Sequence, residues 1–459
     1  MKIENINITE SIENAKKQVA EDKTLSPAMR ETFSLLIFII TLLINKLGIN
    51  SSNSSVPPSQ DPNRNKTKRK TRKDKGLKRK PGGQKGHPGT TLTQVDDPTE
   101  KEFIEIDRRT IPKGEYKDVG VEKRQVFDIK VSLEVKEYQA QILEDKDGNQ
   151  HIAKFPEGVT KAAQYGNTVK SQAVYMSVFQ LIPLARILDY FKEQVGLSIS
   201  KGSISNFKKL AYKRLQEIGF RYWVSMRLLS SELNHADETG INVNGQRIWL
   251  HSISNEKYVL YHPDLKRGKE AMDRMGILPK YGGFLCHDHW KPYYKFDDCT
   301  HALCNAHHLR ELERAYEHDN QSWANKISEL LSEINDLMIE SKVEVLPEEK
   351  IKAYQKRYRS ILTKGKKECP LPEKNPSQKG RVKKTKSRNL LERLIDFEDD
   401  TLRFMKEPLV PFTNNLGEND IRMTKVQQKI SGCFRNMEGA EEFSLIRSYI
   451  VTARKNGVG

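Results

Sequence analysis

Apolar residues near the start of the chain form one regular stripe. Five of them recur at alternating spacings of three and four: Phe33, Leu36, Ile40, Leu43 and Leu47. This spacing predicts a helix carrying the seam of a short coiled coil, and Gly48 supplies a stop signal after it. A helix packed on its own domain would show the same stripe. Self-association and internal packing are therefore two open alternatives for residues 1–48.

Residues 49–98 have the composition of a disordered linker. Ser, Asn, Pro, Gly and Lys dominate, and large apolar side chains are almost absent. Eleven Lys or Arg residues lie between positions 64 and 80, enough to bind nucleic-acid phosphates without reading sequence. A merely solvated tail is the alternative. The DNA-binding candidates in this segment are Lys68, Arg69, Lys70, Arg72, Lys78, Arg79 and Lys80.

The next two segments differ in periodicity. Residues 99–160 alternate in strand fashion, as in FIEIDRRTI and RQVFDIKVSLEVKEYQAQIL, and predict a small β-rich module. Residues 161–230 have helical patterns, with a helix, a Gly-containing turn and a second basic helix in LDYFKEQVGLSISKGSISNFKKLAYKRL. Lys208 and Lys209 make this helix-turn-helix-like region a DNA-binding candidate. Ordinary packing with a basic exposed face explains the pattern nearly as well.

From residue 231 onward the pattern predicts an α/β sheet interrupted by helices. Apolar runs around HADETG, QRIWLHSIS, KYVLYHP and GGFLCHD predict strands, with one helix before the last of them. Residues 305–407 are mostly helical, and the tail is helical again. We expect one domain built from 231–304 and 408–459, with 305–407 as a helical insertion.

Charge and cysteine content narrow the class of protein. A net charge of +17 favours a polyanionic partner, nucleic acid more than a membrane surface. Five cysteines without regular spacing fit a reducing cytosol. The apolar run at 33–44 is too short to span a bilayer and lacks the layout of a signal peptide. We therefore expect a cytoplasmic, multidomain α/β protein with no membrane partner.

Two acids occupy positions from which they could share a cation. Asp237 lies where an apolar strand is expected to end, and Asp288 ends the strand GGFLCHD, 51 residues later. That interval accommodates two strands and a helix, the layout of a ribonuclease H-like sheet, whose nucleases use two divalent ions. Magnesium prefers oxygen ligands, and Glu418, near the start of a helix, is a candidate third acid. Taken singly, a turn, a buried hydrogen-bonded acid and a capping box led by Asn415 would also explain these residues.

Cysteines and histidines crowd into residues 286–308 and suggest a different metal site. Cys304 and His307 have the spacing of zinc ligands. A structural zinc site needs four converging ligands, however, and CNAHHLREL looks like the opening of a helix. The pattern therefore argues against zinc and makes His307 and His308 candidates for residues beside the metal ligands or facing DNA.

Five blocks in fixed order resemble the insertion sequence 66 family of bacterial transposases. They are INSSNSSVPPSQD with the basic run and KPGGQKGHPGTTL, then HADETG, GFLCHDHWKPYY, HALCNAHHLRELE and PFTNNLGENDIRMTKVQQKISGCFRN. The resemblance implies a ribonuclease H-like domain whose DDE triad is Asp237, Asp288 and Glu418. It also implies two Mg²⁺ ions, with Mn²⁺ as a substitute, and cleavage at the ends of a mobile element followed by strand transfer into target DNA.

The resemblance also implies which partners to expect, and this sequence departs from the family pattern in one respect. DNA ends, target DNA, further copies of the chain and accessory element-encoded proteins are the expected partners, in a bacterial cytoplasm at the nucleoid. Many relatives carry a cysteine-paired zinc module before the helical region, but no cysteine precedes Cys286 here. Residues 99–160 would then occupy the place of that module without its metal.

Two other functions fit parts of the sequence. A catalytically decayed DNA-binding protein or regulator is one, although all three acids are present. A nuclease of the same fold that does not join strands is the other, and the sequence separates it only weakly from a transposase. The remaining DNA-binding candidates are Arg422, Lys425 and Arg435.

Overall fold

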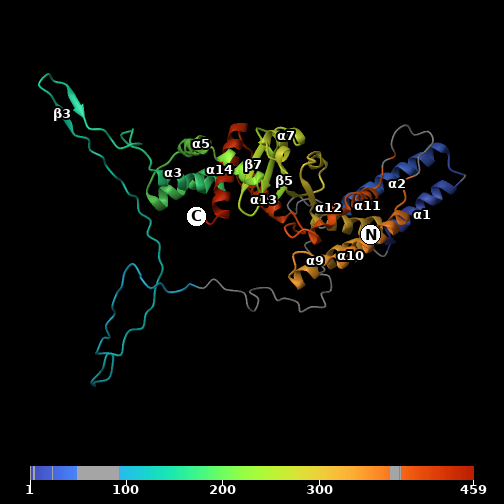
Figure 1. Cartoon of the computed structure of the whole chain (residues 1–459), viewed down its shortest axis with the longest axis horizontal. Coiled ribbons are helices and arrows are strands. Elements are labelled where there is room, and N and C mark those ends of the chain that lie inside the picture. The colour runs from blue at the N-terminus through green and yellow to red at the C-terminus, as the bar shows by residue number, and fades with distance from the viewer. Residues whose placement is uncertain are drawn as a thin grey trace. The chain divides into compact units, whose positions relative to one another are not determined.

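The computed structural model describes residues 2–3, 6–22, 24–48, 92–372, 382 and 384–458 (Figure 1). The chain divides into two compact units, one of residues 1–65, 155–191 and 198–459 and the other of 66–154 and 192–197. Within the described ranges, no helix is both long and apolar enough to cross a membrane. The linker candidates Lys68, Arg69, Lys70, Arg72, Lys78, Arg79 and Lys80 lie outside the described residues.

Two helices form the described N-terminal part. The elements are β1 (Lys2–Ile3), β2 (Ile6–Asn7), α1 (Ile8–Glu21) and α2 (Pro27–Gly48). Helix α2 starts where the Ser26 hydroxyl accepts the Met29 N–H at 3.3 Å, and its described part runs to Gly48. The described side chains of the predicted seam are 40–54% exposed: Phe33, Leu36, Ile40 and Leu43. Helix α1 therefore does not cover this seam.

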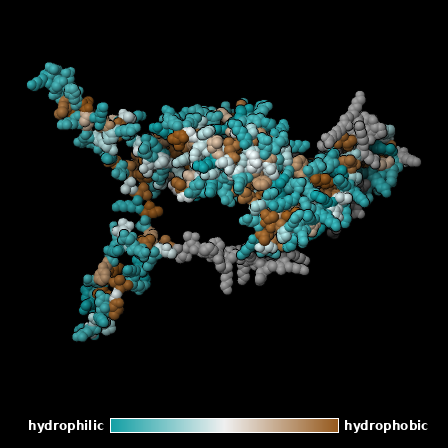
Figure 2. Space-filling view, in the orientation of Figure 1, coloured by the Kyte–Doolittle hydropathy of each residue, from teal (hydrophilic) through white to brown (hydrophobic). Residues whose placement is uncertain are grey.

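The β-rich module predicted for 99–160 is largely absent. One hairpin forms, β3 (Ile142–Glu144) with β4 (Gln150–Ile152), and no strand forms in 103–111 or 124–141. Apolar side chains of this segment are exposed, 69% for Phe103 and 92% for Val126, and Figure 2 shows them scattered among hydrophilic residues. Alternation stabilises a sheet when its apolar face is buried against another layer. No such layer exists in the described part of this unit.

Residues 161–230 are helical, as predicted. The elements are α3 (Asn167–Val174), the π-helical turn η1 (Tyr175–Phe179), α4 (Leu184–Tyr190), the π-helical turn η2 (Phe191–Val195), α5 (Lys201–Glu217) and α6 (Phe220–Leu229). Helix α5 begins where the Ser200 hydroxyl accepts the Ser203 N–H at 3.0 Å. Its apolar face is buried, and the helix packs against α14 (Met437–Lys455).

A mixed five-stranded sheet organises the following region (Figure 1). Its strands are β5 (Leu233–Val243), β6 (Gln246–Ser254), β7 (Val259–Asp264), β8 (Phe284–His287) and β9 (Thr300–Leu303), in the order β7-β6-β5-β8-β9. The pairs β5–β6 and β6–β7 are antiparallel, whereas β5–β8 and β8–β9 are parallel. Asn244 and Gly245, with φ of 49° and 80°, form the two-residue turn that joins β5 to β6.

Short helices flank β8, and two long helices pack on the sheet. The short ones are α7 (Lys269–Met275), the 3₁₀ helix η3 (Leu278–Lys280) and the 3₁₀ helix η4 (Lys291–Lys295). Helix α13 (Asn415–Ser431) packs on β5, and α14 packs on the edge strand β7. Hydroxyls of Ser448 and Thr452 accept the backbone N–H groups of Tyr261 and Val259, at 2.9 and 3.2 Å. Helix α14 thereby satisfies donors that an edge strand would otherwise leave open.

The insertion predicted for 305–407 is helical in its described part. It contains α8 (Asn305–Asp319), α9 (Ser322–Ser341), α10 (Glu348–Glu368), α11 (Lys386–Asp396), α12 (Glu398–Leu402) and the 3₁₀ helix η5 (Arg403–Met405). Its own core includes the buried side chains of Trp323, Leu331, Tyr358 and Leu391. The Asn305 N–H donates to the Phe412 carbonyl at 3.1 Å, so the chain leaves and rejoins the sheet domain at neighbouring points.

Candidate active site

Asp237 and Asp288 lie at the same level relative to the register of the parallel strands β5 and β8. The parallel register last pairs His235 with Cys286, and each acid follows its paired residue by two positions. Asp288 comes directly after β8, as the sequence predicts. Asp237 lies inside β5 rather than at a strand end, a correction to the expectation from the sequence. The reason is that β5 continues to pair with β6 for several residues beyond it.

Glu418 enters the same region from the first turn of α13. Asn414, just before this helix, ties its start to β5: its Oδ1 hydrogen-bonds with His235 Nδ1 at 2.7 Å, and its Nδ2 donates to the Ala236 carbonyl at 2.9 Å. No side-chain cap hydrogen bond forms at this helix start, so the capping box led by Asn415 is wrong. Glu418 therefore has no helix-capping role: its carboxylate contacts Cys304, His307 and Arg310, and its charge raises the pKa of Asp237.

The three acids interact through their charges. Burial raises the pKa of Asp237 well above its ordinary value, and the neighbouring Glu238, Asp288 and Glu418 carboxylates raise it further. Ionised carboxylates gathered in a buried place repel one another unless a cation lies among them. Three carboxylate groups are also the oxygen donors that Mg²⁺ and Mn²⁺ prefer. The donor chemistry of Asp237, Asp288 and Glu418 thus fits a hard divalent ion, although among the described residues their oxygen atoms do not all lie within 4.8 Å of one another.

A fourth acid, Glu238, belongs to the same cluster and was missed from the sequence. Its side chain is 2% exposed, and its pKa is raised to about 7 by burial and by Asp288. The Tyr293 hydroxyl donates to its Oε2 at 2.7 Å, and Arg267 donates to its Oε1 at 2.7 and 3.1 Å. Successive strand residues face opposite sides. Adjacency to Asp237 in the sequence therefore gave no sign that Glu238 would also approach Asp288.

A stack of aromatic and cationic side chains connects Glu238 to Asp288. The Arg267 guanidinium lies between the rings of Trp249 and Trp290, 4.5 and 4.4 Å from their centroids. The Trp290 backbone N–H donates to Asp288 Oδ1 at 2.9 Å. Stacking on two rings holds the guanidinium flat and restricts its motion. The stack of Trp249, Arg267 and Trp290 therefore holds Arg267 in place beside Glu238 and also holds the segment that carries Asp288.

The raised pKa of Glu238 predicts a pH-dependent stability. Because the folded state holds this proton more tightly than the unfolded chain does, wild-type stability falls as pH rises from its ordinary pKa of 4.5 to about 7. The total effect is about 3 kcal/mol. Glu238→Gln should flatten this part of the melting temperature profile, measured with chelator present. Parallel profiles for wild type and variant would show that Glu238 is not the group that titrates.

Two cations from the helical insertion face the acids. Burial lowers the pKa of Arg393 on α11, whereas the negative charge of nearby Asp288 raises that pKa. The Arg393 guanidinium also forms an ion pair with Glu311 of α8. The buried Nε of Arg393 has no hydrogen-bond partner among the described residues. Arg310 Nη2 lies 4.0 Å from Glu418 Oε2. These residues were missed because no local pattern reveals which insertion helices pack against the strand ends.

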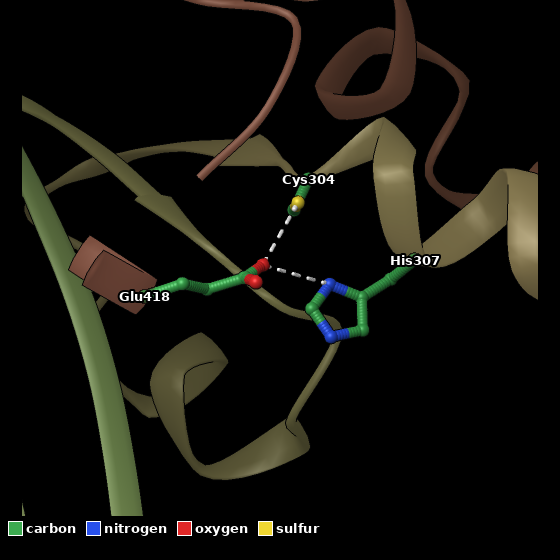
Figure 3. A group of neighbouring side chains, drawn as sticks. All are labelled: Cys304, His307 and Glu418. Atoms are coloured by element: carbon green, nitrogen blue, oxygen red, sulfur yellow. Dashed lines mark hydrogen bonds and ion pairs between the residues drawn. The ribbon is translucent and has the colours of Figure 1, made fainter. Parts of the chain in front are cut away.

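Of the two predicted histidines, His307 lies beside Glu418 and His308 is buried in the protein. His307 Nδ1 is 3.6 Å from Glu418 Oε1 (Figure 3). His308 is 2% exposed, and its Nδ1 hydrogen-bonds with Asn305 Oδ1 at 3.1 Å, so it cannot face DNA. Burial lowers the pKa of both rings and favours their neutral forms.

The basic candidates on α5 are engaged with acids of α14. Lys209 Nζ lies 3.5 Å from Glu438 Oε1. Burial lowers the pKa of Lys208, and the nearby Glu442 carboxylate opposes that shift. These contacts support the alternative that α5 uses part of its basic face for packing.

The candidates near the C-terminus separate into two kinds. Lys425 Nζ donates to the Gly240 carbonyl of β5, so this lysine helps to dock α13 on the sheet. Arg422 on α13 and Arg435 before α14 are exposed and accessible to a large partner. Their DNA contact stays a prediction.

Comparison with known families covers most of the described chain. The model of the family described as "Transposase IS66 family" matches residues 162–442, which is more than half of the chain. A second model, a family of unknown function called DUF6444, matches residues 9–93. No curated protein matches the chain. The first match contains the whole sheet, all three acids and the complete helical insertion.

Proposed function

The chain belongs to the IS66 family of transposases, and we propose that it cuts DNA at the ends of a mobile element and transfers the freed 3′ ends to target DNA. The observation that supports this proposal is that the carboxylates of Asp288 and Glu418, from distant parts of the sequence, both raise the pKa of Asp237. A strand-transfer assay with the element's own ends tests it. We also propose that the protein acts in the bacterial cytoplasm, on the DNA of the nucleoid.

The topology of the sheet supports a ribonuclease H-like catalytic domain. Three antiparallel strands are followed by two parallel ones, and the order β7-β6-β5-β8-β9 puts β5 at the centre. The catalytic acids of the proposal come from this central strand, from the end of its parallel neighbour and from the helix packed on it. The helical insertion lies between β9 and α13 in the sequence, within the domain. It contributes positively charged side chains to the proposed active site.

Asp237, Asp288 and Glu418 would hold two Mg²⁺ ions, or Mn²⁺ in their place. Such ions supply activation of the attacking oxygen and stabilisation of the leaving one. Other residues of the chain would orient the segments that carry these three carboxylates before any ion binds. Asn414 fixes the start of α13, and the Trp290 N–H orients the Asp288 carboxylate.

Glu238 acts as a positioning residue in this proposal. Its two oxygens are occupied by Tyr293 and Arg267, so it has little capacity left for a ligand. It instead holds the Trp249, Arg267 and Trp290 stack beside Asp288. This positioning role accounts for the buried Glu238 next to Asp237 without making Glu238 a metal ligand.

Arg393 and Arg310 would contact the phosphates of the DNA strand that is cut. A guanidinium offers several donors to phosphate oxygens, and a buried one gains more from such contacts than an exposed one. The unpaired Nε of Arg393 is one donor that a phosphate oxygen could satisfy. In this way the insertion completes the site rather than merely extending the domain.

Self-association through α2 would bring two active sites to a pair of DNA ends. The cavity between α1 and α2 is lined by Lys16, Val19, Ala20, Arg30, Ser34, Ile37 and Phe38, and the seam residues are not among them. Leu36 and Ile40 remain 48% and 46% exposed. A second copy of the same seam is the partner that their spacing fits.

A pair of neighbouring leucines tests this interface. Leu36→Asp should raise the dimer dissociation constant about a hundredfold, because a carboxylate would be buried in the seam. Leu35→Asp removes a leucine that is at least as accessible, 58% exposed, but lies off the stripe, so it should change the constant by less than about threefold. Sedimentation equilibrium measures both. Equal effects of the two substitutions would rule out the seam as the interface.

A further inference from the structure

Three donor atoms of mixed chemistry converge beside the proposed active site. Cys304 Sγ lies 3.7 Å and His307 Nδ1 lies 3.6 Å from the same oxygen, Glu418 Oε1. Figure 3 shows the carboxylate of Glu418 facing both side chains from the opposite segment. Among the described residues, this is the one group of three metal-binding side chains whose ligand atoms all come within 4.8 Å of one another.

These separations suit a small tetrahedral ion. Zinc bonds of about 2.0 to 2.3 Å at tetrahedral angles separate neighbouring donors by about 3.3 to 3.6 Å. The observed separations from the Glu418 oxygen exceed this by a few tenths of an ångström at most. The third separation, between Cys304 Sγ and His307 Nδ1, is within 4.8 Å, so side-chain rotation would have to bring these two donors closer together on binding.

The sulfur and nitrogen donors of this group also favour zinc over magnesium. Thiolate and imidazole ligands favour Zn²⁺, whereas Mg²⁺ prefers oxygen. The His307 Nδ1 is buried and has no hydrogen-bond partner among the described residues, since 3.6 Å is too long for one. The Asn414 N–H donates to Cys304 Sγ at 3.1 Å, a contact that would stabilise a metal-bound thiolate.

We propose that Cys304, His307 and Glu418 bind one thiophilic divalent ion, Zn²⁺, and that this ion inhibits the enzyme by withdrawing Glu418 from the other two acids. On binding, the Cys304 thiol releases its proton to solvent and the sulfur becomes a ligand. Three protein ligands leave the fourth position open to water. The inhibitory part rests on the proposed function, whereas the binding part does not.

The site differs from the structural zinc site that the sequence argued against. The other cysteines and histidines of 286–308 do not join it: Cys286 lies in the apolar core, and His287 hydrogen-bonds with His301 at 3.0 Å. The third ligand instead comes from Glu418, more than a hundred residues away. An open three-ligand site of this kind is suited to reversible inhibition rather than to holding the fold together.

Cobalt titration tests the binding directly, since Co²⁺ replaces Zn²⁺ and a cobalt–thiolate bond gives a charge-transfer absorption. Wild-type protein should bind one Co²⁺ ion with this band. Cys304→Ser should lose the band, and His307→Gln should weaken binding at least tenfold. Cys433→Ser, which changes an exposed cysteine, is the matched control and should behave as wild type. Absence of the band from wild type, or its persistence in Cys304→Ser, would overturn the site.

Inhibition is measured separately, as the Zn²⁺ concentration that halves Mg²⁺-dependent cleavage. This concentration should rise at least tenfold in Cys304→Ser, with each protein compared to its own rate without zinc, and should not change in Cys433→Ser. Equal zinc sensitivity of the two variants would refute the inhibitory role. If wild-type protein cleaves no DNA at all, the proposed function fails, and the cobalt band still decides whether the site binds metal.

Discussion

Asp288→Asn is expected to lower Mg²⁺-dependent cleavage of element-end DNA at least about a thousandfold, a loss of about 4 kcal/mol of transition-state stabilisation. The substitution keeps the shape of the side chain and its hydrogen bond from Trp290 but removes the negative charge that a cation needs. Cleavage of a labelled duplex under single-turnover conditions measures the effect.

Two controls separate chemistry from folding and binding. Asp297→Asn makes the same chemical change at an exposed acid of the same segment and should leave the rate unchanged. The Asp288→Asn protein should bind DNA normally and melt no lower than wild type, because the change also relieves repulsion with Asp237. Cleavage at the wild-type rate by Asp288→Asn would show that the acids have been assigned wrongly.

Arg393→Ala is expected to lower the same cleavage rate about a hundredfold, because a buried guanidinium near Asp288 would no longer balance the charge of the reacting phosphate. Arg393→Lys keeps the charge without the planar donors and should retain an intermediate rate. Arg359→Ala, which breaks an ion pair with Glu398 in the insertion, is the control and should have no effect on the rate.

The ion pair with Glu311 offers an internal check on this prediction. If Arg393 acts on DNA, Glu311→Ala should preserve the rate or raise it, since the guanidinium becomes more available. If Arg393 only holds α11 against α8, Glu311→Ala should lower the rate as much as Arg393→Ala does. The second result would assign Arg393 a structural role.

The long, strongly patterned elements were predictable from the sequence. The helix that carries the apolar stripe of residues 33–43, the helices of 161–230, the alternation of strands and helix before Asp288 and the helical insertion all appear in the structure. Each depends on apolar periodicity within one segment, which the sequence displays directly. Most of the strands predicted for 99–160 do not form. The alternating apolar side chains there are exposed, so no buried face stabilises a sheet.

The composition of the site was only partly predictable, for a different physical reason. Asp237, Asp288 and Glu418 could be proposed because ordered motifs mark them. Glu238 became visible only when the register of β5 and the stacked Arg267 were known. Arg393 and Arg310 depend on how the insertion folds back on the sheet, a long-range contact that leaves no local pattern.

The proposed transposase must join DNA strands as well as cut them. The most direct measurement incubates purified wild-type protein with the element's end DNA, a target duplex and Mg²⁺, and looks for products in which a 3′ end of the element is covalently linked to the target. We predict such joined products, dependent on the divalent ion. Cleaved ends without joined products would instead indicate a nuclease, and unreacted DNA bound to the protein would indicate a DNA-binding protein that has lost its activity.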